Sequence, residues 1–268
     1  MINWPILYIK QLKEIYMSKL ISLVCPTHKR PTLQKRFAGS VFDTCYKKSI
    51  VEIIFAIDED DLVARETAKE IQQKHGEDSV RIALVNPNLE RLAEIVNECV
   101  EVCPPRGGVI GNLADDTVFR SKRWDVTVLR EFEKYEDKIL LLWGDDGLWG
   151  GSLASHFFLH KNWIKTLGHM QPTHFYADWT DHWMMRLAKR LGRAKVIKDR
   201  SKLFIEHLHA EHGGMEKDET YFLVKERREK NVAQGINFSH DNAPKRLEQF
   251  HEEEYIKLKY FIDNYGKK

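Results

Sequence analysis

Short apolar runs that alternate with helical segments are the feature of this sequence that most restricts its fold. Runs with the composition of buried strands occupy residues 20–25, 51–57, 80–85, 108–111 and 138–143. Residues 62–75 between them carry good helix formers up to Gly76. Residues 89–103 place apolar side chains on one helical face, and two prolines follow. Strands that alternate with helices are typical of a largely parallel sheet covered by helices on both faces, so we expect an α/β fold.

Acidic pairs follow three of these predicted strands. The pairs are Asp58 with Asp60, Asp115 with Asp116, and Asp145 with Asp146. In open α/β sheets, ligands bind outside the carboxyl ends of the strands, and carboxylates gathered there repel one another. A divalent cation such as Mg²⁺ or Mn²⁺ would relieve this repulsion and would also neutralise a diphosphate. The alternative for each single pair is a cap on the following helix.

The composition favours one folded α/β domain. Of the 268 residues, 43% are hydrophobic and 11% aromatic, which is enough for a substantial core. A formal net charge of +2 gives no strong attraction to nucleic acid or to a membrane surface.

The cysteines and the N-terminus predict a cytoplasmic protein. None of the four cysteines has CxxC spacing, and Cys25 and Cys99 lie inside apolar segments, as free cysteines do. The N-terminal apolar stretch is too short for a transmembrane segment, and it lacks the basic start and long apolar core of a signal peptide.

Three motifs resemble the nucleotide-sugar-dependent glycosyltransferases of the GT-A fold, particularly the family-2-like branch. They are CPTHKRP (25–31), FAIDEDD (55–61) and LADDTVFRSKRWD (113–125), and the resemblance covers roughly residues 18–222. It implies a Rossmann-like, mostly parallel central sheet flanked by helices. On this basis we expect an N-terminal extension over 1–16, a GT-A catalytic domain over 17–222 and a C-terminal helical tail over 223–268.

The resemblance also implies a site for a nucleoside-diphosphate sugar, the donor substrate. The residues that it assigns to the nucleotide are Pro26, Thr27, Arg30, Asp58, Asp60 and Asn97. Carboxylates accept hydrogen bonds from ribose hydroxyls or a base N–H, whereas arginine makes forked contacts with phosphate.

The metal-binding acidic motif of this family, usually written DxD, corresponds here to Ala114-Asp115-Asp116. Because alanine replaces the first acid, Asp116 is the better metal ligand and Asp115 is expected to contact the sugar or ribose. In the family a late histidine completes the metal shell, and His207 and His209 would point the same way in a strand. Imidazole is a reasonable third ligand for Mn²⁺, although these histidines could instead belong to the surface or a loop.

Asp178 and Asp181 are the candidate catalytic bases. Their spacing of i, i+3 would place both on one face at the start of a helix. In inverting members of the resembled family, an acid in this region deprotonates the acceptor hydroxyl. Asp178 is the first choice, and its alternative role is to cap that helix.

The segment GDDG (144–147) is predicted to bind the acceptor through Asp145 and Asp146, and it is also a rival metal site. Glycines on both sides suggest a mobile turn that could close over a ligand. The neighbouring Trp143 and Trp149 could stack on a sugar or a base, with core packing as the alternative.

These features together predict a metal-dependent glycosyltransferase that transfers a sugar to a hydroxyl group of a glycan, a small molecule or a hydroxymethylated nucleic-acid base. The basic stretch KERREK (225–230) suggests the nucleic-acid acceptor. A metal-dependent nucleotidyl or phosphoryl transferase remains an alternative, but the sequence lacks the GxxxxGK[ST] phosphate loop. A non-catalytic nucleic-acid-binding protein would explain the basic stretch but not the acids at three strand ends.

Overall fold

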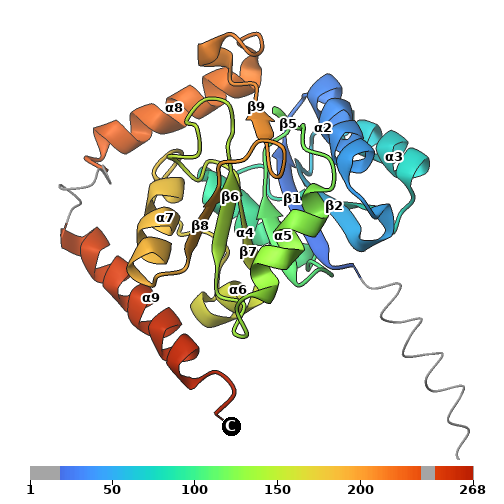
Figure 1. Cartoon of the computed structure of the whole chain (residues 1–268). Coiled ribbons are helices and arrows are strands. Elements are labelled where there is room, and N and C mark those ends of the chain that lie inside the picture. The colour runs from blue at the N-terminus through green and yellow to red at the C-terminus, as the bar shows by residue number, and fades with distance from the viewer. Residues whose placement is uncertain (1–18, 237–244, 268) are drawn as a thin grey trace, which may run out of the picture.

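The structure is a computed structural model that describes residues 19–236 and 245–267. Its central feature is one seven-stranded sheet with the order β3-β2-β1-β4-β7-β6-β8 (Figure 1). Its strands are β1 (Ile21–Thr27), β2 (Val51–Asp58), β3 (Val80–Val85), β4 (Val109–Asn112), β6 (Leu141–Gly144), β7 (Phe157–His160) and β8 (Ala194–Ile197). All neighbouring pairs are parallel except those that β7 makes with β4 and β6. The expected α/β fold with a mostly parallel sheet is confirmed.

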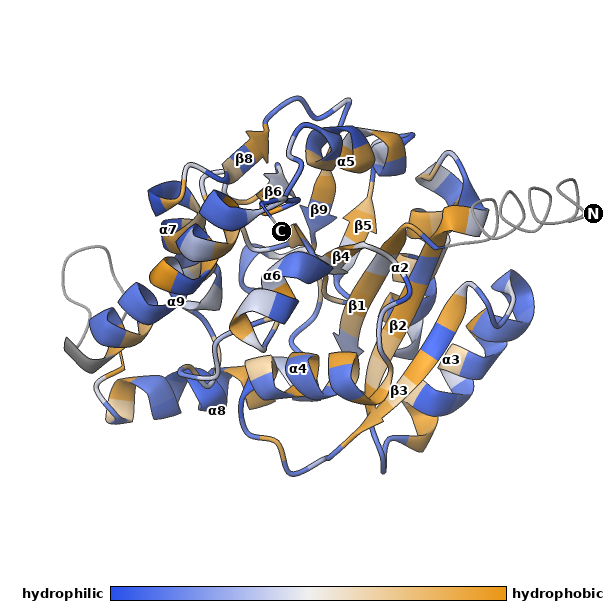
Figure 2. Ribbon diagram, turned by 90° about the horizontal axis from the view of Figure 1, so that it is seen from below, coloured by the Kyte–Doolittle hydropathy of each residue, from blue (hydrophilic) through white to orange (hydrophobic). Residues whose placement is uncertain are grey.

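Helices cover both faces of this sheet. On one face lie α2 (Pro31–Thr44), α3 (Leu62–His75) and α5 (Trp124–Glu133), and on the other lie α4 (Leu92–Val102), α6 (Lys161–Leu167) and α7 (Thr180–Arg190). Alternate residues of each strand supply the two cores: Leu23 packs on the first face and Val24 on the second. The inner strands therefore carry mainly apolar side chains on both faces, as the orange of β2 in Figure 2 shows.

The helix predicted over 62–75 occupies the same residues. Asp61 begins it by accepting a hydrogen bond from the backbone N–H of Ala64 (2.9 Å), and Gly76 ends it with a φ of +92°. The helix predicted over 89–103 begins later, at Leu92. The side chain of Glu94 accepts a hydrogen bond from the backbone N–H of Arg91 and so fixes this start.

Smaller elements lie around the carboxyl ends of the strands. The strands β5 (Thr117–Phe119) and β9 (Ile205–His207) form a separate antiparallel pair. The 3₁₀ turn η2 (Ala210–His212) and the helix α8 (Glu219–Ala233) complete this part of the chain, whereas the 3₁₀ turn η1 (Lys48–Ile50) directly precedes β2. The residues expected to form an N-terminal extension, 1–16, lie outside the described residues. None of the helices in residues 19–236 and 245–267 has the length and apolarity that a membrane crossing demands.

The last helix, α9 (Lys245–Asn264), packs against α6 and α7 through a buried acid. Glu254 accepts a hydrogen bond from the indole N–H of Trp183 (2.7 Å), and its other oxygen lies 3.0 Å from Nε2 of His169. Burial raises the pKa of Glu254 to about 7 and lowers the pKa of His169. Both shifts favour the uncharged forms of the two side chains.

The contribution of Glu254 to the free energy of unfolding, taken as the difference between the original protein and the Glu254→Gln variant, should therefore fall as the pH rises from about 4.5 to about 7. Over this range the unfolded chain releases the proton of Glu254 while the folded chain retains it. The loss should be on the order of 2 kcal/mol. Urea unfolding at a series of pH values measures it, and the Glu254→Gln variant should lack this part of the slope. Identical slopes in both proteins would contradict the assignment.

Candidate active site

A cavity of about 740 Å³ opens at the carboxyl ends of the parallel strands. Its walls come from distant parts of the sequence. They include Thr27 after β1, Asp58 at the end of β2, Asp116 after β4, Asp181 at the start of α7 and Arg227 on α8. This is the edge at which open α/β sheets bind ligands.

The short β5–β9 pair brings Asp116 next to His207. Thr117 pairs with His207, and the backbone N–H of Leu208 donates to the carbonyl oxygen of Asp116 (2.9 Å). As a result, Oδ2 of Asp116 lies 3.5 Å from Nε2 of His207. These two predicted metal ligands are thus held together by backbone hydrogen bonds, independently of any ion.

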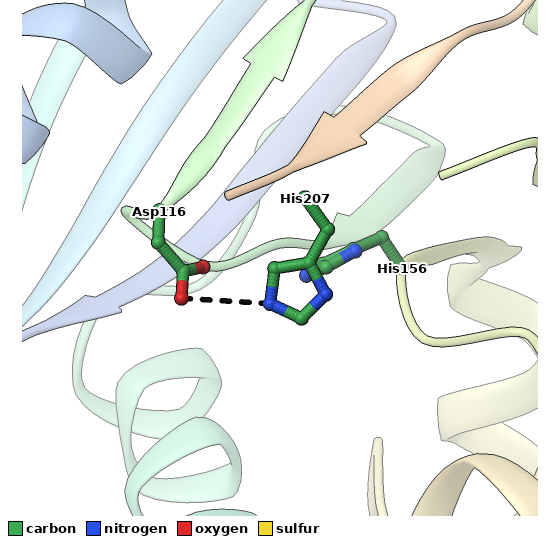
Figure 3. Close-up of side chains that lie close together, drawn as sticks. All are labelled: Asp116, His156 and His207. Carbon is green, nitrogen blue, oxygen red and sulfur yellow. Dashed lines mark ion pairs between the residues drawn. The ribbon is translucent and has the colours of Figure 1, made fainter. Parts of the chain in front are cut away.

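The reversed strand β7 adds a third side chain, His156. Because β7 runs antiparallel to β4, its first residue, Phe157, pairs with Asn112, the last residue of β4. His156 therefore lies at the carboxyl edge of the sheet, beside the chain that leads to Asp116. Its ring is perpendicular to that of His207, with centroids 4.7 Å apart (Figure 3).

Asp116, His156 and His207 form a group that could hold a metal ion. Each offers one ligand atom, and these atoms lie within 4.8 Å of one another. Oδ1 of Asp116 and Nδ1 of both histidines are buried without a hydrogen-bond partner in the described residues. Buried polar atoms are normally paired, so an unpaired atom on each of these three side chains fits a site that binds a ligand. A carboxylate and two imidazoles suit a divalent transition ion.

The two adjacent carboxylates differ in their surroundings. Burial and the negative charge of Asp116 raise the pKa of Asp115 to about 6. Burial also acts to raise the pKa of Asp116. The hydrogen bond between Asp116 and His207 and the positive charge nearby have a larger effect, and they lower the pKa of Asp116 to about 2. Burial lowers the pKa of His156 to about 3 and keeps its imidazole neutral, as a metal ligand must be.

Asp115 holds the loop after β1 in position. Its oxygens accept from Oγ1 of Thr27 (2.7 Å) and Nη1 of Arg30 (3.1 Å). Arg30 also makes a bidentate pair with Asp218, with distances of 2.6 and 2.7 Å. The predicted nucleotide residues Thr27, Arg30 and Asp115 therefore form one network, which Pro26 adjoins in the cavity wall.

The other predicted nucleotide residues divide into two groups. Asp58 lines the cavity and lies 2.9 Å from Nδ1 of His28. Asp60 is exposed and does not line the cavity. Asn97 is also outside the cavity wall, since its side chain is bonded to the backbone of Met170 and Gln171. The roles of all three in nucleotide binding stay predictions.

Asp178 and Asp181 both line the cavity but differ in their partners. Asp178 forms an ion pair with Arg228 (3.0 Å). Asp178 and the next residue, Trp179, both have a positive φ, a strained backbone conformation often found at functional sites. Asp181 lies in the first turn of α7, where Oδ1 accepts from the backbone and ring of His182. The negative charge of Asp181 acts to raise the pKa of the buried His156, against the larger effect of burial.

Asp145 and Asp146 are bonded within their own loop and lie outside the wall of the main cavity. Asp145 pairs with Arg200 (2.8 Å) and accepts from the backbone N–H of Gly147 (2.7 Å). Asp146 accepts from the backbone N–H groups of Leu148 and Trp149 and from Oγ of Ser155. Binding of an acceptor by these two acids stays a prediction, and their observed contacts shape the loop that leads to His156.

The two tryptophans beside this loop have different environments. Trp143 is buried, and its indole N–H donates to the carbonyl oxygen of Gly151 (2.8 Å). Trp149 is 50% exposed and lines the cavity. Only Trp149 can therefore present an aromatic face to a ligand.

The last candidate metal ligand, His209, lies beside the group without belonging to it. It follows the end of β9, and its ring centroid is 5.1 Å from that of His207. Its Nδ1 accepts from the backbone N–H of Glu211 (3.2 Å). His156, in contrast, was not predicted as a ligand, because only the antiparallel direction of β7 brings it to this edge.

Part of the basic stretch 225–230 faces this cavity. Arg227 lines it and donates to the carbonyl oxygen of Leu89 (3.1 Å), while Arg228 pairs with Asp178 and Glu211. Lys230 pairs with Glu90. These contacts tie α8 to the cavity walls.

Comparison with known proteins supports the fold. No family model and no curated protein matches the sequence. One similar structure is that of the mannosyltransferase PcManGT from Pyrobaculum calidifontis, solved in complex with GDP-Man and Mn²⁺. Its TM-score is 0.57 at 12% sequence identity, and the match covers 96% of this chain and 77% of PcManGT. S. aureus TarS 1–349 in complex with UDP-GlcNAc gives 0.55 at 13% identity, covering 92% and 74%. Another TarS structure gives 0.53 at 10% identity, and this chain covers 43% of it. The chain therefore has the expected GT-A fold.

Replacing Asp146 by alanine should lower the free energy of unfolding by about 2 to 3 kcal/mol, because three donors in the loop would lose their acceptor. Asp145→Ala is the matched control. This substitution removes one backbone hydrogen bond, from Gly147, and an ion pair with Arg200, which is 55% exposed, so the loss should be smaller than in the Asp146 variant. Urea unfolding measures both values, and an equal or larger loss in the Asp145 variant would contradict this account.

Proposed function

We propose that this protein is a metal-dependent glycosyltransferase that uses a nucleoside-diphosphate sugar as donor and a hydroxyl group as acceptor. The observation that carries the proposal is the group of Asp116, His156 and His207, with its unpaired buried atoms, in the main cavity of a GT-A fold. The bound GDP-Man and Mn²⁺ of PcManGT and the bound UDP-GlcNAc of TarS support it. Four free cysteines support a reducing compartment, the cytoplasm, as the place of action.

In this proposal the loop after β1 binds the nucleotide end of the donor. Arg30 provides a planar cation that suits a diphosphate, and Asp58 provides a carboxylate for ribose or base. Asp116 and His207 would hold the divalent ion, which when bound neutralises the negative charge of the departing diphosphate. The nearby Asp115 keeps Thr27 and Arg30 in position through its two hydrogen bonds.

Asp181 is the stronger candidate for the general base. The carboxylate of Asp178 is occupied by the guanidinium of Arg228, so its lone pairs are less available to an acceptor hydroxyl. The second oxygen of Asp181, Oδ2, has no partner among residues 19–236 and 245–267. A base must lie within hydrogen-bond reach of the hydroxyl it deprotonates, and Asp181 lines the cavity that the acceptor would enter.

For the acceptor, we propose that Trp149 provides a stacking surface at the cavity wall. Its half-exposed indole is held by a loop that Asp146 fixes, so little freedom is lost when a flat sugar or base face packs on it. Both a glycan and a modified base present such a face. The pairing of Arg228 and Lys230 with acids leaves the basic stretch with less free charge for a nucleic-acid backbone than its sequence suggests.

A thermal-shift screen of nucleotide sugars, with and without Mn²⁺, tests the donor. One donor should raise the melting temperature in the presence of Mn²⁺, and the Asp116→Asn variant should lose most of this gain because it loses a charged ligand. Stabilisation by nucleoside triphosphates, with release of pyrophosphate, would support the nucleotidyl transferase instead. Metal-independent binding of DNA or RNA without turnover would support the nucleic-acid-binding alternative.

Replacing the base should reduce turnover without reducing donor binding. We expect Asp181→Asn to lower kcat on the order of 10²-fold to 10⁴-fold while the donor-induced thermal shift stays unchanged. Asp178→Asn is the matched control, with an expected loss of less than about tenfold. Product formation at saturating donor measures both, and a larger loss in Asp178→Asn would assign the base to that residue.

A further inference from the structure

We propose that His156 is a ligand of the divalent ion and that, together with His207, it makes the site select Mn²⁺ over Mg²⁺. The role of the ion in the reaction depends on the proposed function. The identity of its ligands depends only on the positions of this chain's own residues.

The geometry of the group fits a single ion with small adjustments. Two ligand atoms that each lie about 2.1 Å from an ion are roughly 3 Å apart when adjacent and roughly 4.2 Å apart when opposite. Oδ2 of Asp116 and Nε2 of His207 are already 3.5 Å apart, and the ligand atoms of all three residues lie within 4.8 Å. The ring plane of His156 is at 89° to that of His207, with ring centroids 4.7 Å apart (Figure 3).

The site is poor in oxygen ligands. Ala114 occupies the position at which an oxygen-rich site would have a further acid, and the oxygens of Asp115 are engaged by Thr27 and Arg30. Asp146 is engaged by its own loop. One carboxylate and two imidazoles therefore remain within reach of the ion in the described part of the chain.

A ligand set of this composition discriminates between the two ions. Mg²⁺ prefers oxygen ligands in a regular octahedron and gives up its water reluctantly. Imidazole suits transition ions, whose affinity for nitrogen ligands exceeds that of Mg²⁺. Three protein ligands would leave coordination positions for two diphosphate oxygens and water.

His209 is the matched control for His156. Both histidines line the cavity and lie close to His207, with ring centroids 5.1 and 4.7 Å from it. The difference is that His209 stands outside the metal-binding group and accepts a backbone hydrogen bond from Glu211. Substitution of either one by glutamine removes an imidazole from the same cavity.

The experiment uses the full-length protein stripped of metal and titrated with Mn²⁺ or Mg²⁺ in a calorimeter, without donor or acceptor. Mn²⁺ should bind about tenfold or more tightly than Mg²⁺. Pulsed electron paramagnetic resonance of bound Mn²⁺ should detect two ¹⁴N ligands. His156→Gln should retain one nitrogen and lose about tenfold or more in Mn²⁺ affinity, whereas His209→Gln should retain both nitrogens and bind as the original protein does.

Equal affinities for Mg²⁺ and Mn²⁺, a single nitrogen ligand in the original protein, or loss of a nitrogen in His209→Gln would each overturn the proposal. Circular dichroism and melting in EDTA check that His156→Gln is folded. If it is not, the nitrogen count and the affinity ratio of the original protein decide alone. The metal titration contains no sugar donor, so its result does not depend on transferase activity. Absence of that activity would refute the proposed function, but the metal affinities and the nitrogen count would remain valid.

Discussion

The backbone pairing of β5 with β9 is the constraint on which the rest of the site depends. It holds Asp116 beside His207, and the antiparallel pairing of β7 with β4 adds His156. These pairings place a carboxylate and two imidazoles around one space while three of their atoms remain unpaired. Burial of polar atoms without partners costs free energy, so a ligand that bonds to these atoms is favoured. Preorganisation of this kind reduces the cost of binding an ion.

The adjacent acids Asp115 and Asp116 show how one strand end serves two purposes. Asp115 points to the β1 loop and ties Thr27 to Arg30, whereas Asp116 points to the histidines. Successive side chains diverge after a strand, so neighbouring carboxylates reach different partners. Their opposite pKa shifts follow from these partners, since Asp115 is buried beside a like charge and Asp116 is hydrogen-bonded to His207. The two acids of the pair therefore have different roles in the structure.

The fold could be predicted from the sequence because its signals are local. Apolar runs and helix ends such as Asp61 and Gly76 are set by neighbouring residues, and they were located within a few positions. The site could be predicted only where residues follow a strand directly, as Asp116 does. His156 depends on the direction of β7, which the hydrophobic pattern does not encode. The hydrogen bonds of Asn97 to the segment at Gln171 likewise depend on packing between distant segments.

The same dependence on distant contacts changes the interpretation of α8. The boundary expected at residue 222 falls inside this helix, whose first turn is tied to the β1 loop. Asp218 holds the guanidinium of Arg30, and Oγ1 of Thr220 donates to the carbonyl oxygen of His28. A diphosphate that bound Arg30 would compete with Asp218 for the same donors, because a guanidinium has one planar set of N–H groups. Binding of a diphosphate by Arg30, as proposed, would therefore act on the contact between the β1 loop and Asp218, the residue before α8.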